Sequence, residues 1–405
     1  MSDKAKQYYI NVERHDWIAG IQGTRRSSIR MSALKFESPL AELCLLSLVL
    51  FSVSVAIHTI TNPNIYSDIN SVWERPEIHG RGLPYVDFTF EYPAVIGWLL
   101  YASSWSNYDL YLGIQGLVLS LSVLGIVLAL YKLHVSSERT LIYVVAAPTM
   151  LIYGFYNWDL ILVAFVMLAI VALRANRIKM AGLLFGLGIA TKVYSIVLVP
   201  VVLTELKRWK ERIEMIAFCA LAWVAPNLPF MLLSPSGWME TWIYHKNWGF
   251  EDTWLLLLSP NDRFNLFVKL FGFFLLGLTL LRTTFMSSPS LLLRERLLMA
   301  GITWLLFSYV STPQMVLMLL PLFALNHTRY SLFYASEAAN VLIILTWFTV
   351  PDPLAIWSEP QLMNLIRQSI WAGILAYYMT GKNLRYKIPA FLNWLRSPLT
   401  GRNPK

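Results

Sequence analysis

The feature that most limits the fold of this chain is a series of long apolar runs, such as residues 40–60 and 111–131. A helix needs about 20 apolar residues to cross the hydrocarbon core of a bilayer, and these runs have that length. They are apolar all round rather than along one stripe, and a water-soluble fold cannot bury so many helices of that kind. Only 14% of the 405 residues are charged, against about 25% in soluble proteins. The sequence therefore predicts an all-α polytopic membrane protein.

The formal net charge of +9 comes from basic residues in short segments between the apolar runs. This pattern follows the positive-inside rule of membrane proteins, so we expect membrane lipids and no nucleic acid as partners. The two cysteines, Cys44 and Cys219, lie in or beside apolar runs. They indicate neither a disulfide framework nor a Cys-ligated metal site. The first apolar run is long enough to span, so we expect no cleavable signal peptide.

The basic clusters also predict the topology. If all of them are cytoplasmic, the chain crosses the membrane an even number of times between consecutive clusters. Polar or helix-breaking residues at 156–159, 191–192 and 311–314 then mark outer turns. Both ends of the chain, a basic arm 1–39 and a basic tail 381–405, are expected in the cytoplasm. The twelve predicted spans are 40–61, 111–131, 140–155, 159–173, 180–190, 193–206, 213–233, 264–281, 296–310, 313–326, 331–349 and 361–380.

The spans shorter than about 16 residues cannot cross about 30 Å unaided, so they predict local thinning or a cavity that opens outward. The largest outer segment, 62–110, is rich in acids. Its apolar stretch 94–104 predicts a helix in the outer interface, and if this helix spans, the topology downstream reverses. We divide the membrane part into a catalytic module, 40–233, which includes this loop, and a C-terminal module, 234–380, with a second outer loop, 234–262.

Residues of several catalytic types fall on the predicted outer side. A sugar on a lipid phosphate presents its reactive carbon there, and its transfer to an alcohol needs a carboxylate to take the acceptor proton. It also needs positive charge or N–H donors where negative charge develops on the departing phosphate. We predict Asp68 as the general base and Lys192 with His245 as the groups that hold the donor phosphate. The predicted sugar or acceptor pocket consists of Asp87, Glu91, Tyr92, Asn157, Asp159, Trp248, Glu251 and Gln314.

Each candidate also has a purely structural interpretation. Asp68 follows a span closely, where an aspartate is often a solvated loop residue or a helix cap. Asp87 and Glu91 can pair with arginines of the same loop. Asp159 can cap the helix that begins there. Lys192 can extend its amine to the outer interface, although an ionisable residue between apolar segments is more often functional.

The familiar soluble chemistries have no signal in this sequence, because it contains no HExxH, CxxC, P-loop or dinucleotide fingerprint. We therefore expect no cofactor and no metal site, while a divalent ion beside the acidic loop stays open. A transporter or flippase of lipid-linked sugars is the alternative. It would share the outer cavity and Lys192 but would need no base at Asp68. A membrane scaffold without activity is a weaker alternative.

An ordered set of short motifs resembles the GT-C fold glycosyltransferases, most closely glycosyltransferase family 87. That family includes mannosyltransferases that use polyprenyl-phosphate mannose. The resemblance covers roughly residues 40–325 and leaves out the N-terminal arm and the last spans. Each motif is weak alone, and their order and spacing carry the resemblance. The motifs are Tyr66-Ser67-Asp68, residues 82–87 with Glu91-Tyr92-Pro93, Tyr156-Asn157-Trp158-Asp159, residues 186–192, Tyr244-His245 with residues 248–251, and Ser311-Thr312-Pro313-Gln314.

This resemblance implies an inverting transferase of GT-C type that works on the extracytoplasmic side with a polyprenyl-phosphate sugar as donor. The resemblance favours mannose as the sugar and a lipid or glycan as the acceptor. It favours the plasma membrane of a prokaryote as the location. Asp68 matches the family's base, Lys192 the lysine near the donor phosphate and His245 the histidine of the later loop. The chain departs from the family where Trp248 stands in place of an arginine, so the sugar and the acceptor stay open.

Overall fold

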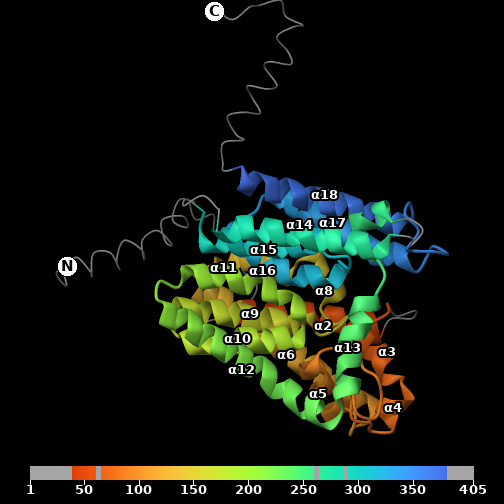
Figure 1. Ribbon diagram of the computed structural model, residues 1–405. Helices are drawn as coiled ribbons and strands as arrows, with labels where there is room; N and C mark the ends of the chain where they lie inside the picture. Colours follow the sequence, from red (N-terminus) through yellow and green to blue (C-terminus); the bar gives the residue numbers. More distant parts are fainter. Residues whose placement is uncertain (1–38, 61–64, 260–263, 286–290, 381–405) are drawn as a thin grey trace, which may run out of the picture. The chain divides into compact units, whose positions relative to one another are not determined.

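The computed structural model describes residues 39–60, 65–259, 264–285 and 291–380, and helices linked by turns and loops make up this part of the chain (Figure 1). Its β contacts are two isolated bridges, Pro84 with Phe88 and Glu251 with Val310. The predicted cytoplasmic arm, up to residue 38, and the predicted tail 381–405 lie outside the described residues. The all-α prediction is therefore confirmed for the described part.

Long apolar helices mark the protein as a membrane protein. On α6 (Tyr108–Lys132), Leu117 is 60% exposed, and on α14 (Asn265–Phe285), Phe267 is 72% exposed. Apolar surface costs about 25 cal/mol per Å² in water, so such faces are suited to lipid rather than to solvent. Four helices in the described part are long and apolar enough to cross a membrane: α2 (Pro39–Thr59), α6 (Tyr108–Lys132), α12 (Trp209–Leu233) and α14 (Asn265–Phe285).

Each of the twelve predicted spans coincides with helix. The predicted helix 140–155 is divided, because Pro148 has no amide hydrogen to continue a helix and begins α8 instead. The helices at the positions of the remaining predicted spans are α7 (Ser137–Thr140), the π-helical turn η1 (Leu141–Val145), α8 (Pro148–Tyr153), α9 (Asp159–Arg174), α10 (Ile178–Thr191), the 3-10 helix η2 (Val193–Val197), α11 (Leu198–Glu205), α15 (Leu293–Phe307), the 3-10 helix η4 (Pro313–Met318), α16 (Leu319–Asn326), α17 (Tyr330–Trp347) and α18 (Glu359–Met379).

Two glycines set the close packing of α10 on α12. A Cβ at Gly186 would lie 2.2 Å from the carbonyl oxygen of Cys219, and one at Gly182 would lie 2.6 Å from that of Met215. Glycines four residues apart share one helix face, and small residues at this spacing let two membrane helices approach closely. The packing fixes the position of α10 and therefore of Lys192, which follows its last turn.

The segments predicted to lie on the outer side form a group of short helices at one end of the long ones (Figure 1). Residues 94–103 form α5, whose Trp98 indole donates to the carbonyl of Pro226 at 2.9 Å. A helix of ten residues rises only about 15 Å, too little to cross a bilayer unaided. Residues 235–247, predicted only as loop, form a helix that is tied to the first outer loop by a bond from Thr241 to the carbonyl of Phe90. The short helices are α3 (Asp68–Trp73), α4 (Pro76–His79), α5 (Ala94–Ser103), α13 (Pro235–Asn247) and the 3-10 helix η3 (Trp254–Leu258).

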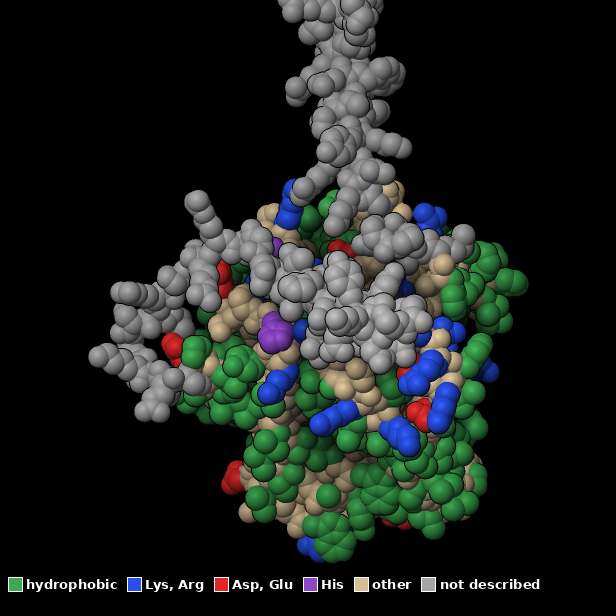
Figure 2. Space-filling model, turned by 90° about the vertical axis from the view of Figure 1, so that its left-hand side faces the viewer, with side chains coloured by type: hydrophobic (Ala, Val, Ile, Leu, Met, Phe, Trp, Pro, Cys, Tyr) green, Lys and Arg blue, Asp and Glu red, His purple; other side chains and the backbone are tan. Residues whose placement is uncertain are grey.

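Basic side chains gather at the opposite end of the helices, which faces the viewer in Figure 2. α9 runs toward this end and finishes at Arg174, and α10 runs back from it. Arg296, near the start of α15, pairs with Glu205 at the end of α11. Arg139 donates to the carbonyl of Ala324, near the end of α16, at 3.4 Å. Basic clusters that are distant in sequence thus lie at one end of the fold.

Candidate functional site

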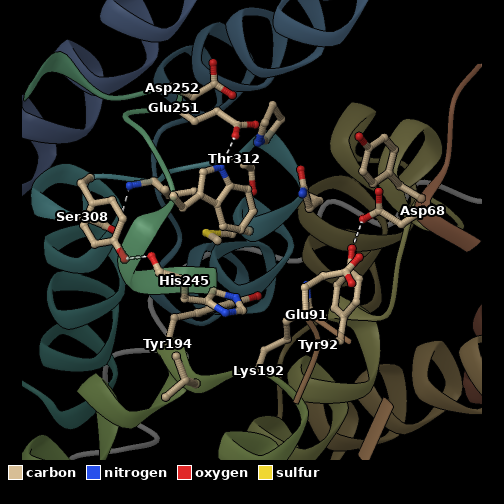
Figure 3. A pocket seen from close by; sticks show the side chains of 18 of the residues that line it. Asp68, Glu91, Tyr92, Lys192, Tyr194, His245, Glu251, Asp252, Ser308 and Thr312 are labelled. Carbon is tan, nitrogen blue, oxygen red and sulfur yellow. Dashed lines mark hydrogen bonds between the residues drawn. The ribbon is translucent and has the colours of Figure 1, made fainter. Parts of the chain in front are cut away.

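A cavity of about 610 Å³ lies at the end of the long helices that carries these short helices. Figure 3 shows Asp68 and Tyr92 on one side of it and Glu251 on another. Both predicted modules contribute residues to its lining. The lining comes from six stretches of the chain: 66–93, 153–156, 192–194, 242–252, 304–315 and 343–348.

Asp68 is the first residue of α3. The hydroxyl of Ser67 accepts from the backbone of Asn70 and caps this helix. The carboxylate of Asp68 accepts from the hydroxyl of Tyr92 at 2.5 Å and from the side-chain amide of Asn157 at 3.4 Å. Burial raises the pKa of Asp68, although the bond from Tyr92 and the charge of Lys192 oppose this rise. A carboxylate with a raised pKa is a better proton acceptor than one exposed to water.

Lys192 occupies an extended break between α10 and η2, with φ −152° and ψ 122°. Its ammonium lies 3.3 Å from the carboxylate of Asp159, which is completely buried. The hydroxyl of Tyr194 donates to the other oxygen of that carboxylate. The side chain of Lys192 is 13% exposed and reaches the cavity. Asp159 therefore fixes the lysine from behind and does not line the cavity.

Tyr92 connects the two charged groups. Its hydroxyl donates to Asp68, and its ring lies 4.7 Å from the ammonium of Lys192. A cation over an aromatic face is attracted to it. The ring of Tyr92 packs in turn edge-on against Trp158, with 4.9 Å between ring centroids. A carboxylate and an ammonium thus face one cavity with a single tyrosine between them.

Arg75 and Glu91 form an ion pair at the edge of the cavity. Both nitrogens of the guanidinium fork donate to the Glu91 carboxylate, one of them at 2.9 Å. The pair is partly open to solvent, with the two side chains 31% and 21% exposed. A bidentate pair of this kind has a fixed geometry. The structure thus contains the contact that the structural interpretation of Glu91 predicts, which is a pair with an arginine of the same loop.

His245 lines the cavity from α13. Its Nδ1 lies 2.7 Å from the carbonyl oxygen of Thr241, which can only accept, so Nδ1 carries a hydrogen. Burial and the charge of Lys192 lower the pKa of His245. The imidazole is then neutral near pH 7 and its Nε2 is an acceptor.

Trp248 and Glu251 form a second polar pair in the cavity wall. The indole nitrogen of Trp248 donates to the carboxylate of Glu251 at 2.8 Å. The backbone of Glu251 is held by Tyr309 and Ser311, through bonds of 3.1 and 2.9 Å. Burial, reinforced by the negative charge of Asp68, raises the pKa of Glu251 to about 7. This wall therefore presents an indole and a carboxyl group that is largely protonated below neutral pH.

A buried arginine that the sequence prediction did not include supports this wall. The guanidinium of Arg367, on α18, donates to the side chain of Asn340 at 2.5 Å and to the carbonyl of Ser311 at 2.6 Å. It also lies 3.4 Å from the carbonyl of Asp252. Asp252 itself has a left-handed backbone, φ 49°, and burial raises its pKa to about 8. The one signal for Arg367 in the sequence was its position inside an apolar span, where an ionisable residue is rarely idle.

The structure brings most of the predicted site residues together. Asn157 and Asp159 lie behind the cavity wall, where they hold Asp68 and Lys192. Asp87 is elsewhere: its carboxylate accepts from the backbone of Leu83 in an exposed turn of the first outer loop. The predicted residues that line the cavity are Asp68, Glu91, Tyr92, Lys192, His245, Trp248, Glu251 and Gln314.

Among the described residues, no three His, Cys, Asp or Glu side chains are grouped so that they could hold a metal ion. The sequence matches no protein-family model and has no significant match among curated proteins.

Proposed function

We propose that the protein is an inverting glycosyltransferase of the GT-C type that moves a sugar from a polyprenyl phosphate to a hydroxyl acceptor. The observation that carries this proposal is the pairing of Asp68 and Lys192 across Tyr92 in one cavity. A base and a cation that face the same cavity match the two charge changes of the reaction, which are proton loss from the acceptor and negative charge on the departing phosphate.

In the proposed step, the acceptor oxygen attacks the anomeric carbon as Asp68 takes the hydroxyl proton. The bond between the anomeric carbon and the phosphate oxygen breaks, and the phosphate keeps the electron pair. A single displacement of this kind inverts the anomeric centre. Lys192, held from behind by Asp159, neutralises the developing charge without having to reorient. An anion beside His245 would raise the pKa of that imidazole and convert Nε2 from acceptor to donor.

The rest of the cavity agrees with a donor that has a lipid arm and a sugar. Ile343, Trp347 and Phe348, at the end of α17, add an apolar border to the cavity, which suits a polyprenyl chain. Trp248 with Glu251 offers an aromatic face and a hydrogen-bonding carboxyl group for the sugar ring. Mannose, the sugar favoured by the resemblance to family 87, is our first expectation for the donor.

We further propose that all twelve helical segments belong to the membrane domain and that the cavity opens on the extracytoplasmic face. The grouping of Arg139, Arg174 and Arg296 at the other end of the helices supports this orientation, because basic residues favour the cytoplasmic side. The plasma membrane of a prokaryote is the expected location.

The proposal is tested by incubating the purified full chain with polyprenyl-phosphate mannose, glucose and arabinose and a panel of lipid and glycan acceptors. Mass spectrometry detects the product, and NMR reads its anomeric configuration. We expect transfer from one of the donors with inversion. A flippase would instead move the labelled donor between the leaflets of a reconstituted vesicle and form no new glycosidic bond, and that result would refute the proposal.

A further inference from the structure

A second cavity, of about 490 Å³, lies beside the first, between residues 89–91 and α13. Four residues line both cavities: Arg75, Glu91, Tyr244 and Trp248. The ion pair of Arg75 and Glu91 is therefore a shared wall between the two spaces. A ligand in the second cavity has this pair as its border with the first.

The second cavity also lies close to the proposed base. Glu91 lines it, and the next residue, Tyr92, donates its hydroxyl to Asp68 at 2.5 Å. Asp68 lines the first cavity, and Glu91 lines both. A group of a bound molecule that passes the ion pair from the second cavity therefore enters the cavity that contains Asp68.

One face of α13 forms a polar and aromatic side of this cavity. Glu240, Tyr244 and Asn247 follow the spacing that places residues on a single helix face, and Trp248 comes directly after the last residue of the helix. All four residues line the cavity, and Tyr244 is 49% exposed, so its ring is open to a ligand. This side of the cavity offers a carboxylate, an amide and two aromatic rings.

The charge of this cavity selects against anions. Arg75 is the one cation among its lining residues, all of which are described, and both nitrogens of its fork already bind Glu91. Glu240 then leaves the cavity with a net negative charge, which disfavours a phosphate or an acidic peptide. The polar groups equally disfavour an alkyl chain, because they would lose water without gaining a partner. A neutral molecule rich in hydroxyl groups can donate to Glu240 and Asn247 and pack on Tyr244.

We propose that the second cavity binds the carbohydrate part of the acceptor, so that the acceptor is a neutral glycan whose reacting hydroxyl reaches Asp68 past Arg75 and Glu91. This assignment of the acceptor rests on the proposed transferase function. It places the donor and the acceptor glycan on the two sides of one ion pair.

The kinetic test uses Glu240→Gln and Asn247→Ala in the full chain, with Glu77→Gln as the matched control from the same outer end. Glu77 lies outside both cavities and its side chain is exposed. Glu240→Gln replaces a charged acceptor by a neutral amide, and Asn247→Ala removes an amide, so we expect the KM for a glycan acceptor to rise about tenfold while the KM for the donor stays constant. An unchanged acceptor KM, or an equal rise in the donor KM, would overturn the proposal. So would a simple long-chain alcohol that serves as acceptor as well as the glycan does.

A binding test separates this inference from the transferase proposal, because it needs no donor and no turnover. Saturation-transfer NMR is recorded on the full chain, in a detergent without a sugar head group, with methyl α-mannoside, methyl α-glucoside and glucose 6-phosphate. We expect signal from the neutral glycosides that falls in Glu240→Gln and persists in Glu77→Gln. Stronger binding of glucose 6-phosphate, or an equal signal in both variants, would contradict a neutral glycan site even if the protein proves to be a transferase. If the neutral glycosides bind as expected but no sugar transfer is detected, the glycan site is supported and the transferase proposal is contradicted.

Discussion

The two walls of the main cavity handle charge in different ways. The first wall, residues 66–93, 153–156 and 192–194, is held by direct ion pairs, Lys192 with Asp159 behind the wall and Arg75 with Glu91 at its edge. The second wall, residues 242–252, 304–315 and 343–348, presents the neutral imidazole of His245 and acids whose pKa burial has raised to about 7 and about 8. The first wall is thus built to keep charges in place, and the second to offer hydrogen bonds with little charge.

This difference assigns the two halves of the proposed reaction. Charges fixed before the reaction stabilise a transition state without the cost of reorienting them, so the first wall suits the proton and the phosphate. A neutral, hydrogen-bonding wall suits the uncharged sugar ring. If the division is correct, changes in the first wall reduce the rate of transfer, and changes in the second wall alter stability, pH dependence and sugar recognition.

The largest effect on stability is expected from Arg367→Met, which removes the buried support of the second wall. Asn340 and the carbonyl of Ser311 would lose their partner. Removing one member of a buried charged network costs about 3–5 kcal/mol. Thermal unfolding followed by tryptophan fluorescence measures the loss, with Ser369→Ala, an exposed change on the same helix, as the control. Equal unfolding temperatures for the two variants would mean that Arg367 does not hold this wall.

In the first wall, Lys192→Met should lower kcat about 10²- to 10³-fold, the usual cost of losing a group that stabilises developing negative charge. It also leaves Asp159 buried without its cation. The double variant Lys192→Met/Asp159→Asn should therefore recover stability but not rate. Lys179→Met, in the first turn of α10 at the basic end, is the control. Recovery of the rate in the double variant would reduce Lys192 to a structural counter-ion.

A smaller effect is expected in the pH dependence of stability, and it belongs to the second wall. The pKa of Glu251 is raised to about 7 in the folded protein, whereas a glutamate in the unfolded chain has a pKa of about 4.3. Between these two pH values the folded protein therefore holds a proton that the unfolded chain has released. The stabilisation that protonated Glu251 contributes is then present at low pH and is lost as pH rises through about 7. In Glu251→Gln the decline of the unfolding temperature from about pH 5 to pH 7.5 should become shallower, although Asp252 still contributes to it. An unchanged slope would show that Glu251 is not the group that titrates.

The sequence could predict the first wall because its charged residues interrupt apolar runs. Lys192 was visible for that reason, and Asp68 was visible because it closely follows the first apolar run. Even-numbered crossing between basic clusters placed the two on the same side. What the pattern could not supply was the role of Asp159, which holds the lysine from behind instead of facing a ligand. The reason is that the direction of a side chain beside a helix start depends on packing across α9, α10 and η2.

The second wall was harder to predict because it forms by tertiary contact. Glu251 and Val310 are joined by an isolated bridge, and Arg367 reaches the same place from α18. Residues so far apart leave no local periodicity that connects them. Asp87 is the opposite case: this acid in a promising motif accepts a hydrogen bond from the backbone of Leu83, as aspartates in turns often do.

The most direct test of the account is the rate of sugar transfer by Asp68→Asn. The substitution keeps the size of the side chain and its bond from Tyr92 but removes the proton acceptor, so we expect an intact fold and a kcat lowered about 10²- to 10⁴-fold. Asp87→Asn, in the same loop but outside the cavity, should transfer at the normal rate. Full activity in a folded Asp68→Asn protein would contradict the assignment of Asp68 as the base and the mechanism built on it.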